Sequence, residues 1–150
     1  MASILRIFQN EALIAAGLAW LSAELIKFII RFFYVGERTW ARLWSSGGMP
    51  SAHSATVCGL ATAIGLRHGF DGYAFALAMV LAMVVMYDAC GVRRAAGEQA
   101  KILNELGDML MSKNLTPEEK LHEFIGHTPI QVIAGAIWGI TVAALFVLLR

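Results

Sequence analysis

Residues 130–149 read IQVIAGAIWGITVAALFVLL and contain no charged side chain. A helix of about 20 apolar residues is long enough to cross the hydrocarbon core of a bilayer. Three more apolar stretches precede it, at residues 12–34, 51–66 and 73–92, and the second is short for a span. The pattern predicts an all-α fold, a polytopic membrane helical bundle of about four spans.

The composition agrees with this fold class. The chain has 150 residues, of which 58% are hydrophobic and 15% are charged, whereas soluble domains are less apolar and more charged. A soluble bundle would therefore have too little polar surface, and the length suits a single integral-membrane domain over 1–150. A net charge of +1 gives no sign of nucleic-acid binding. Cys58 and Cys90 lack metal-ligand spacing, and we interpret both as small buried hydrophobic residues.

A polar insert at residues 93–126 separates the third and fourth spans. Helical spacing in its first part places apolar side chains on one face, namely Ala96, Ala100, Leu103, Leu106 and Leu110. This pattern predicts an amphipathic surface helix that lies against the bundle or on the membrane surface. A proline in the first turn and a glutamate three residues after the threonine predict a second helix start at residues 116–119.

The stretch SGGMPSAHSA at residues 46–55 is polar and glycine-rich just before an apolar run. The backbone amides of Gly47, Gly48 and a helix starting near Ser51 are suited to hold an anion. His53 would lie in the first turn of that helix, within reach of the bound group. The alternative is an ordinary loop in which Ser51 only caps the helix.

The stretch GHTPIQV at residues 126–132 opens the last apolar run. Thr128, with proline next and Gln131 three residues on, has the pattern of a helix start, so His127 precedes a helix N-terminus. The chain crosses the membrane an odd number of times between His53 and the short turn at residues 67–72, and again an odd number of times between that turn and His127. The two histidines therefore lie on the same side of the membrane. The alternative is that both histidines are merely polar residues at helix starts.

Basic residues gather on that same side. Short loops with many Lys and Arg residues face the cytoplasm, so the asymmetry predicts a cytoplasmic site in a bacterial inner (plasma) membrane. The side with the histidines carries Arg31, Arg38, Arg42, Arg93, Arg94, Lys101, Lys113 and Lys120, and the opposite side carries Arg6, Arg67 and Arg150.

Ionisable residues within spans are costly and suggest function. Glu24, Lys27 and Arg31 share one face of the first helix. Two interpretations stay open: an internal Glu24–Lys27 ion pair with Arg31 reaching the interface, or cations that bind phosphate oxygens. Asp88, at the end of the third span, is either a supporting acid of the site or a partner of an arginine. Arg93 and Arg94, in the polar insert, are candidates for phosphate or lipid-headgroup contact.

Three separated motifs carry a family resemblance: MPSAHSA at residues 49–55, YDACGVRRAAGEQAKILNEL at 87–106 and GHTPIQVIAGAIWG at 126–139. Together they resemble the divergent branch of the type 2 phosphatidic acid phosphatase superfamily, over essentially the whole chain. The resemblance implies that His127 is the nucleophile and His53 the general acid. It also implies that Ser51 and adjacent amides bind phosphate beside Lys and Arg side chains, without a metal or cofactor.

The chain departs from the superfamily pattern in three places. The first motif of the superfamily is a lysine followed seven residues later by Arg-Pro. Lys27 resembles the family lysine, whereas the spacing is kept by Arg31 with Arg38 and Thr39, which are altered residues. The arginine six residues before the nucleophile is Leu121, so Arg93 and Arg94 are its candidate replacements. The carboxylate four residues after the nucleophile, which orients it, is Gln131. Either Gln131 orients His127 without a charge, which predicts a slow enzyme, or it only completes the helix cap.

The resemblance and the site together predict hydrolysis of a lipid phosphate through a phosphohistidine intermediate. Phosphatidylglycerophosphate and phosphatidate are the favoured substrates, followed by isoprenoid diphosphates. A lipid carrier or scramblase with a phosphate-headgroup site is the alternative, and a small structural subunit is a third. We also expect a homodimer, because small residues at 134–136 and Gly139 allow close helix approach. The same residues could instead pack within one chain.

Overall fold

The computed structural model describes residues 6–35, 48–110 and 126–150. In this part of the chain every regular element is helical. The elements are η1 (Arg6–Gln9), α2 (Glu11–Ile30) with the π-helical turn η2 (Arg31–Val35), α4 (Ala52–His68), α5 (Tyr73–Cys90), α6 (Val92–Leu110) and α7 (Pro129–Leu148). The all-α prediction is confirmed, and the helix start predicted at residues 116–119 lies outside the described residues.

Polar side chains define where three of these helices begin. The Asn10 side chain accepts a hydrogen bond from the Leu13 amide, 3.1 Å away, at the start of α2. Ser51 caps α4, and Thr128 caps α7. Each cap satisfies a backbone N–H that has no partner inside its helix. The predicted helix starts at Ser51 and Thr128 are therefore confirmed.

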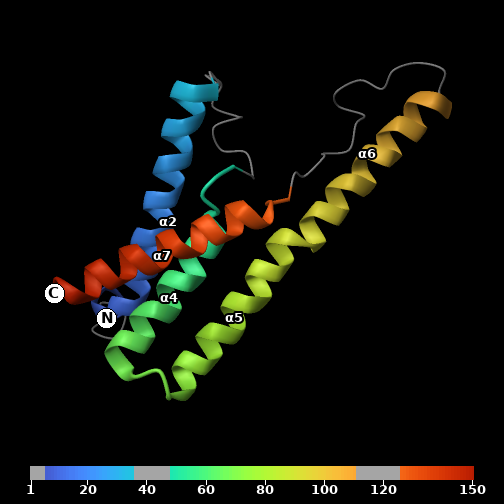
Figure 1. Cartoon of the computed structure of the whole chain (residues 1–150). Coiled ribbons are helices and arrows are strands. Elements are labelled where there is room, and N and C mark those ends of the chain that lie inside the picture. The colour runs from blue at the N-terminus through green and yellow to red at the C-terminus, as the bar shows by residue number, and fades with distance from the viewer. Residues whose placement is uncertain (1–5, 36–47, 111–125) are drawn as a thin grey trace.

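Helix α4 lies at the centre of the bundle and packs against α2, α5 and α7 (Figure 1). Its neighbours meet it through small side chains, which allow close packing of helix backbones without a hydrophobic driving force in lipid. Among the described residues, buried apolar side chains include three clusters along α4: Ala15, Ala63, Ala143 and Val147; Ala19, Ala23, Ala52 and Ala55; and Val57, Cys58 and Ala82.

The large apolar side chains point outward instead. Leu21, Leu77, Met83, Ile137 and many others are exposed on the described helices. An apolar surface of this extent marks a membrane environment. Within the described residues, three helical stretches are long and apolar enough to cross a bilayer, Glu11–Phe33, Tyr73–Leu110 and Pro129–Leu148. The chain is an integral membrane protein, and α4, with 17 residues, is shorter than these and enclosed by them.

Helices α4 and α7 approach each other closely at two glycines of α7. A Cβ atom at Gly135 would collide with the carbonyl oxygen of Ser51, and one at Gly139 with that of Ala55. Both glycines are buried against α4 of the same chain. They serve the packing within one chain, so they lend no support to the predicted homodimer.

Helix α6 continues from the end of α5 and extends away from the other helices (Figure 1). Leu103, Leu106 and Leu110 are exposed on it, whereas Ala100 is buried. The prediction of an amphipathic helix is confirmed, but within the described residues its leucine face is not packed on the bundle. Lys101 and Glu105 are four residues apart on this helix, and the Nζ atom of Lys101 lies 4.0 Å from a carboxylate oxygen of Glu105.

Candidate functional site

Three helix ends meet at one end of the bundle: the start of α4, the end of α5 and the start of α7. The Ser51 amide donates a hydrogen bond to the Gln131 carbonyl oxygen, 3.0 Å away, which joins α4 to α7. The His127 amide donates to the Ala89 carbonyl oxygen, 3.1 Å away, which joins the start of α7 to α5. Backbone contacts therefore fix the segment that carries His127.

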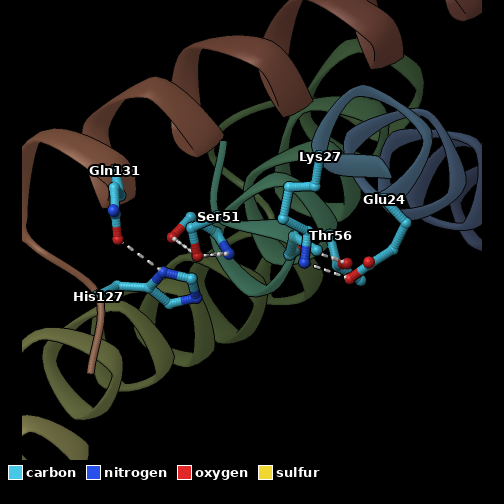
Figure 2. Close-up of polar contacts among 8 residues, drawn as sticks. Glu24, Lys27, Ser51, Thr56, His127 and Gln131 are labelled. Carbon is cyan, nitrogen blue, oxygen red and sulfur yellow. Dashed lines mark hydrogen bonds and ion pairs between the residues drawn. The ribbon is translucent and has the colours of Figure 1, made fainter. Parts of the chain in front are cut away.

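His127 is only 6% exposed, and its Nδ1 atom lies 3.1 Å from the side-chain oxygen of Gln131 (Figure 2). The Thr128 amide donates to the same oxygen at 3.2 Å, and the Gln131 amide donates to the Thr128 hydroxyl at 3.4 Å. Gln131 thus completes the capping box and contacts the ring of His127 with one atom. The expectation that it could serve only one of these purposes was wrong, because both partners approach a single oxygen.

The capping box also fixes which way the Gln131 amide points. A backbone N–H can only donate, so its contact with Thr128 requires the oxygen of Gln131, and not the nitrogen, on that side. The same oxygen faces His127 Nδ1 and can only accept from it. Nδ1 therefore carries the ring proton, and in the neutral ring Nε2 keeps its lone pair.

His53 lies in the first turn of α4, as predicted, and is exposed. Its ring faces that of His127, with 6.2 Å between the centroids and 63° between the planes. The two histidines come from motifs far apart in the sequence, and the folded helices bring them together. One ring is buried and oriented, and the other lies at the surface of the site.

Ser51 is fully buried and occupied by contacts within the protein. Its hydroxyl oxygen accepts hydrogen bonds from the Ser54 hydroxyl at 3.1 Å and the Ser54 amide at 3.4 Å. Its own amide is bonded to Gln131, so that amide is not free to hold phosphate as expected. Ser51 holds α4 against α7, and its buried partner Ser54, three residues along the same helix, was not anticipated from the sequence.

Lys27 is 7% exposed, and its Nζ atom lies 2.6 Å from a carboxylate oxygen of Glu24. Figure 2 shows the pair beside Thr56 of α4, away from the His127 ring. The internal ion pair, one of the two interpretations of this face, is present. Whether Lys27 also contacts phosphate stays a prediction.

Arg31 reaches the glycine segment that leads into α4. A Cβ atom at Gly48 would lie 3.3 Å from a terminal nitrogen of Arg31, and Gly48 has a φ of +89°, which disfavours other residues. The guanidinium thus lies over glycine backbone. Of the cations predicted in the first span, Arg31 is the one that the structure brings to this segment.

Of the other predicted site residues, Asp88 lies on α5, Arg93 and Arg94 lie on α6, and one glycine is not described. Asp88 is partly buried in the last turns of α5, next to the Ala89 carbonyl that holds His127. Arg93 and Arg94 belong to the first turn of α6, which follows the same helix end. Gly47 lies outside the described residues. Roles of these residues in phosphate binding stay predictions.

Comparison with known proteins gives two matches. A family described as the "Divergent PAP2 family" matches residues 8–142. The "Uncharacterized membrane protein YuiD" of Bacillus subtilis (strain 168) is 37% identical over 147 residues, covering 91% of this chain and 93% of that protein. No solved structure matches the chain.

Proposed function

The chain is a membrane protein of the divergent PAP2 family, and we propose from this membership that it is a lipid phosphate phosphatase acting through a phosphohistidine at His127. The observation that carries the proposal is the contact between His127 Nδ1 and Gln131. It leaves Nε2 of a buried ring as the nucleophilic atom, and that ring faces a second histidine.

The reaction follows from these two rings. His127 Nε2 attacks phosphorus, so that an N–P bond forms while the P–O bond to the lipid breaks. His53 gives its proton to the departing alkoxide, and then takes a proton from the water that cleaves the N–P bond.

Cations supply the electrostatic part of the mechanism. In the proposed reaction, Arg and Lys side chains stabilise the negative charge on the equatorial phosphoryl oxygens. Arg31 is the favoured contact because it lies against Gly48 at the entrance to α4. We assign Arg93 and Arg94 supporting contacts, and Lys27 a weaker one because it is neutralised by Glu24.

The substrate class follows from the surroundings of the site. Exposed His53 lies at the end of a bundle whose outer surface is apolar, so acyl chains can stay in the bilayer while the phosphate enters. A phosphomonoester such as phosphatidylglycerophosphate or phosphatidate fits one phosphoryl position between two histidines. The excess of basic residues on this side favours the cytoplasmic leaflet of a bacterial inner membrane.

The test is phosphate release by purified protein from phosphatidate, phosphatidylglycerophosphate and an isoprenoid diphosphate. We expect release from at least one phosphomonoester and its loss in His127→Ala. Tyr73→Ala, which removes an exposed ring at the opposite end of α5, should keep the activity. Headgroup binding without turnover of any substrate would contradict the proposal and favour a lipid carrier.

A further inference from the structure

A second polar hollow lies at the other end of the bundle. It is a cavity of about 380 Å³ between η1, the start of α2 and the end of α4. Arg67 and His68 line it at the C-terminal end of α4, whereas His53 lies at the N-terminal end of the same helix. At 1.5 Å per residue these positions are roughly 20 Å apart along the axis, so the cavity is separate from the candidate active site.

The walls of this cavity are rich in hydrogen-bond donors. Arg67 forms an ion pair with Glu11 that ties α4 to α2, and Asn10 caps α2. Arg6, Gln9 and His68 also face the cavity, and within the described residues none of their side chains has a hydrogen-bond or ion-pair partner. Because Arg67 neutralises Glu11, the positive charge of Arg6 is not compensated by another residue of the cavity lining. The cavity is therefore suited to an anion.

The position of η1 indicates where that anion comes from. Arg6 and Gln9 line the cavity, while Ile7 and Phe8 between them are 51% and 75% exposed. Exposed apolar side chains beside a polar pocket are typical of a segment at the boundary between headgroups and acyl chains. The volume lies within the range of small-molecule sites.

We propose that this cavity binds a phosphate group in the leaflet opposite the candidate active site. Arg6 supplies the charge, and Gln9 and His68 supply further hydrogen bonds. The phosphate belongs to an anionic phospholipid headgroup or to free inorganic phosphate, which present the same oxygen atoms. The site does not depend on the proposed phosphatase activity.

The experiment places a probe next to the cavity. Phe8 of the full-length protein is replaced by the photo-crosslinking amino acid benzoylphenylalanine, and the protein is reconstituted into nanodiscs of phosphatidylcholine with a minor share of phosphatidylglycerol. Mass spectrometry of the crosslinked lipid gives its enrichment over the bilayer. We expect phosphatidylglycerol to be enriched about fivefold, the contribution of one cation near an anionic headgroup, and Arg6→Gln to remove that enrichment. Arg150→Gln, which removes a charge from the last residue of the chain outside the cavity lining, should retain it.

A parallel arm uses inorganic phosphate as the probe, with thermal unfolding of the same proteins in neutral detergent as the readout. Lack of lipid enrichment, together with stabilisation by phosphate that Arg6→Gln loses and Arg150→Gln keeps, would identify free phosphate as the source. If neither probe shows an effect that depends on Arg6, the proposal is overturned. Equal loss of enrichment in both variants would also overturn it, because diffuse charge would then explain the binding.

Discussion

In the proposed reaction, Gln131 would take over part of the role that a carboxylate has in orienting a histidine. Its oxygen accepts from the Thr128 amide and from His127 Nδ1, so the helix cap itself prevents the amide from turning over. An amide that could turn over would select the wrong ring tautomer, and such an error costs about 10⁴ in turnover in a serine protease. For the proposed reaction this contact favours the required tautomer, with the proton on Nδ1, and the difference from a carboxylate is the missing negative charge.

The charge of a carboxylate at position 131 should therefore raise turnover. Hydrogen bonds to charged groups contribute about 1 kcal/mol more than neutral ones, which corresponds to roughly a fivefold change in rate. We expect Gln131→Glu to hydrolyse its lipid substrate about fivefold faster than the unmodified protein. Thermal stability should hardly change, because glutamate is also suited to the capping box.

Gln131→Leu is the matched control, since it removes both the cap and the contact with the ring. Its turnover should fall about 10- to 100-fold, the range known for lost hydrogen bonds that orient metal-bound histidines. If Gln131→Glu and Gln131→Leu had the same turnover as the unmodified protein, another group would have to orient His127.

At the scale of elements, the site depends on how closely α7 approaches α4. The first turn of α7 carries Gln131, and Gly135 and Gly139 one and two turns later lie against the backbone of α4. Separating the two helices would also stretch the bond between the Ser51 amide and the Gln131 carbonyl. Packing and catalysis should therefore respond together to changes at these glycines.

We expect Gly139→Ala to destabilise the protein by about 1–3 kcal/mol, the usual cost of overpacking, and to lower turnover as well. Gly17→Ala in α2 is the matched control, because a Cβ atom there meets nothing within 4 Å. It should be neutral or slightly stabilising, since alanine favours a helix over glycine. Thermal unfolding in detergent measures both, and equal midpoints for the two variants would contradict the close approach.

The sequence predicted the helices and their caps better than it predicted which helix faces pack against each other. The caps at Ser51 and Thr128 and the apolar helix lengths follow from local patterns, and all are found. Periodicity does not tell which neighbour covers a helical face. It therefore left open whether Gly139 packs within one chain or between two, and whether the leucine face of α6 lies on the bundle or on the membrane surface. In the structure Gly139 packs within the chain, and Leu106 is exposed.

At the scale of the whole molecule, counting the crossings was enough to predict that His53 and His127 share one end of the bundle. The distances between helices were not predictable, because they depend on small residues packing across the core. That is why the full burial of Ser51 and the placement of Arg31 over Gly48 emerge only from the structure.

The orientation of the molecule in the membrane can be measured separately from its chemistry. In a background with Cys58→Ala and Cys90→Ala, we expect Asp71→Cys, between α4 and α5, to react with an impermeant maleimide on intact cells. Lys101→Cys in α6 should react only after the membrane is opened. The reverse pattern would place the site outside the cytoplasm and favour isoprenoid diphosphates as substrates.

The most direct test of the central claim is detection of phosphate bound to His127. An aryl phosphate needs little help from an acid to lose its leaving group, but the phosphohistidine still needs His53 to activate water. With a labelled aryl phosphate and an alkaline quench, His53→Ala should accumulate labelled protein, and mass spectrometry should place the label on His127. The double variant His53→Ala, His127→Ala should carry none. Label that persists in this double variant, or its absence from His53→Ala while the unmodified protein turns over, would contradict the account.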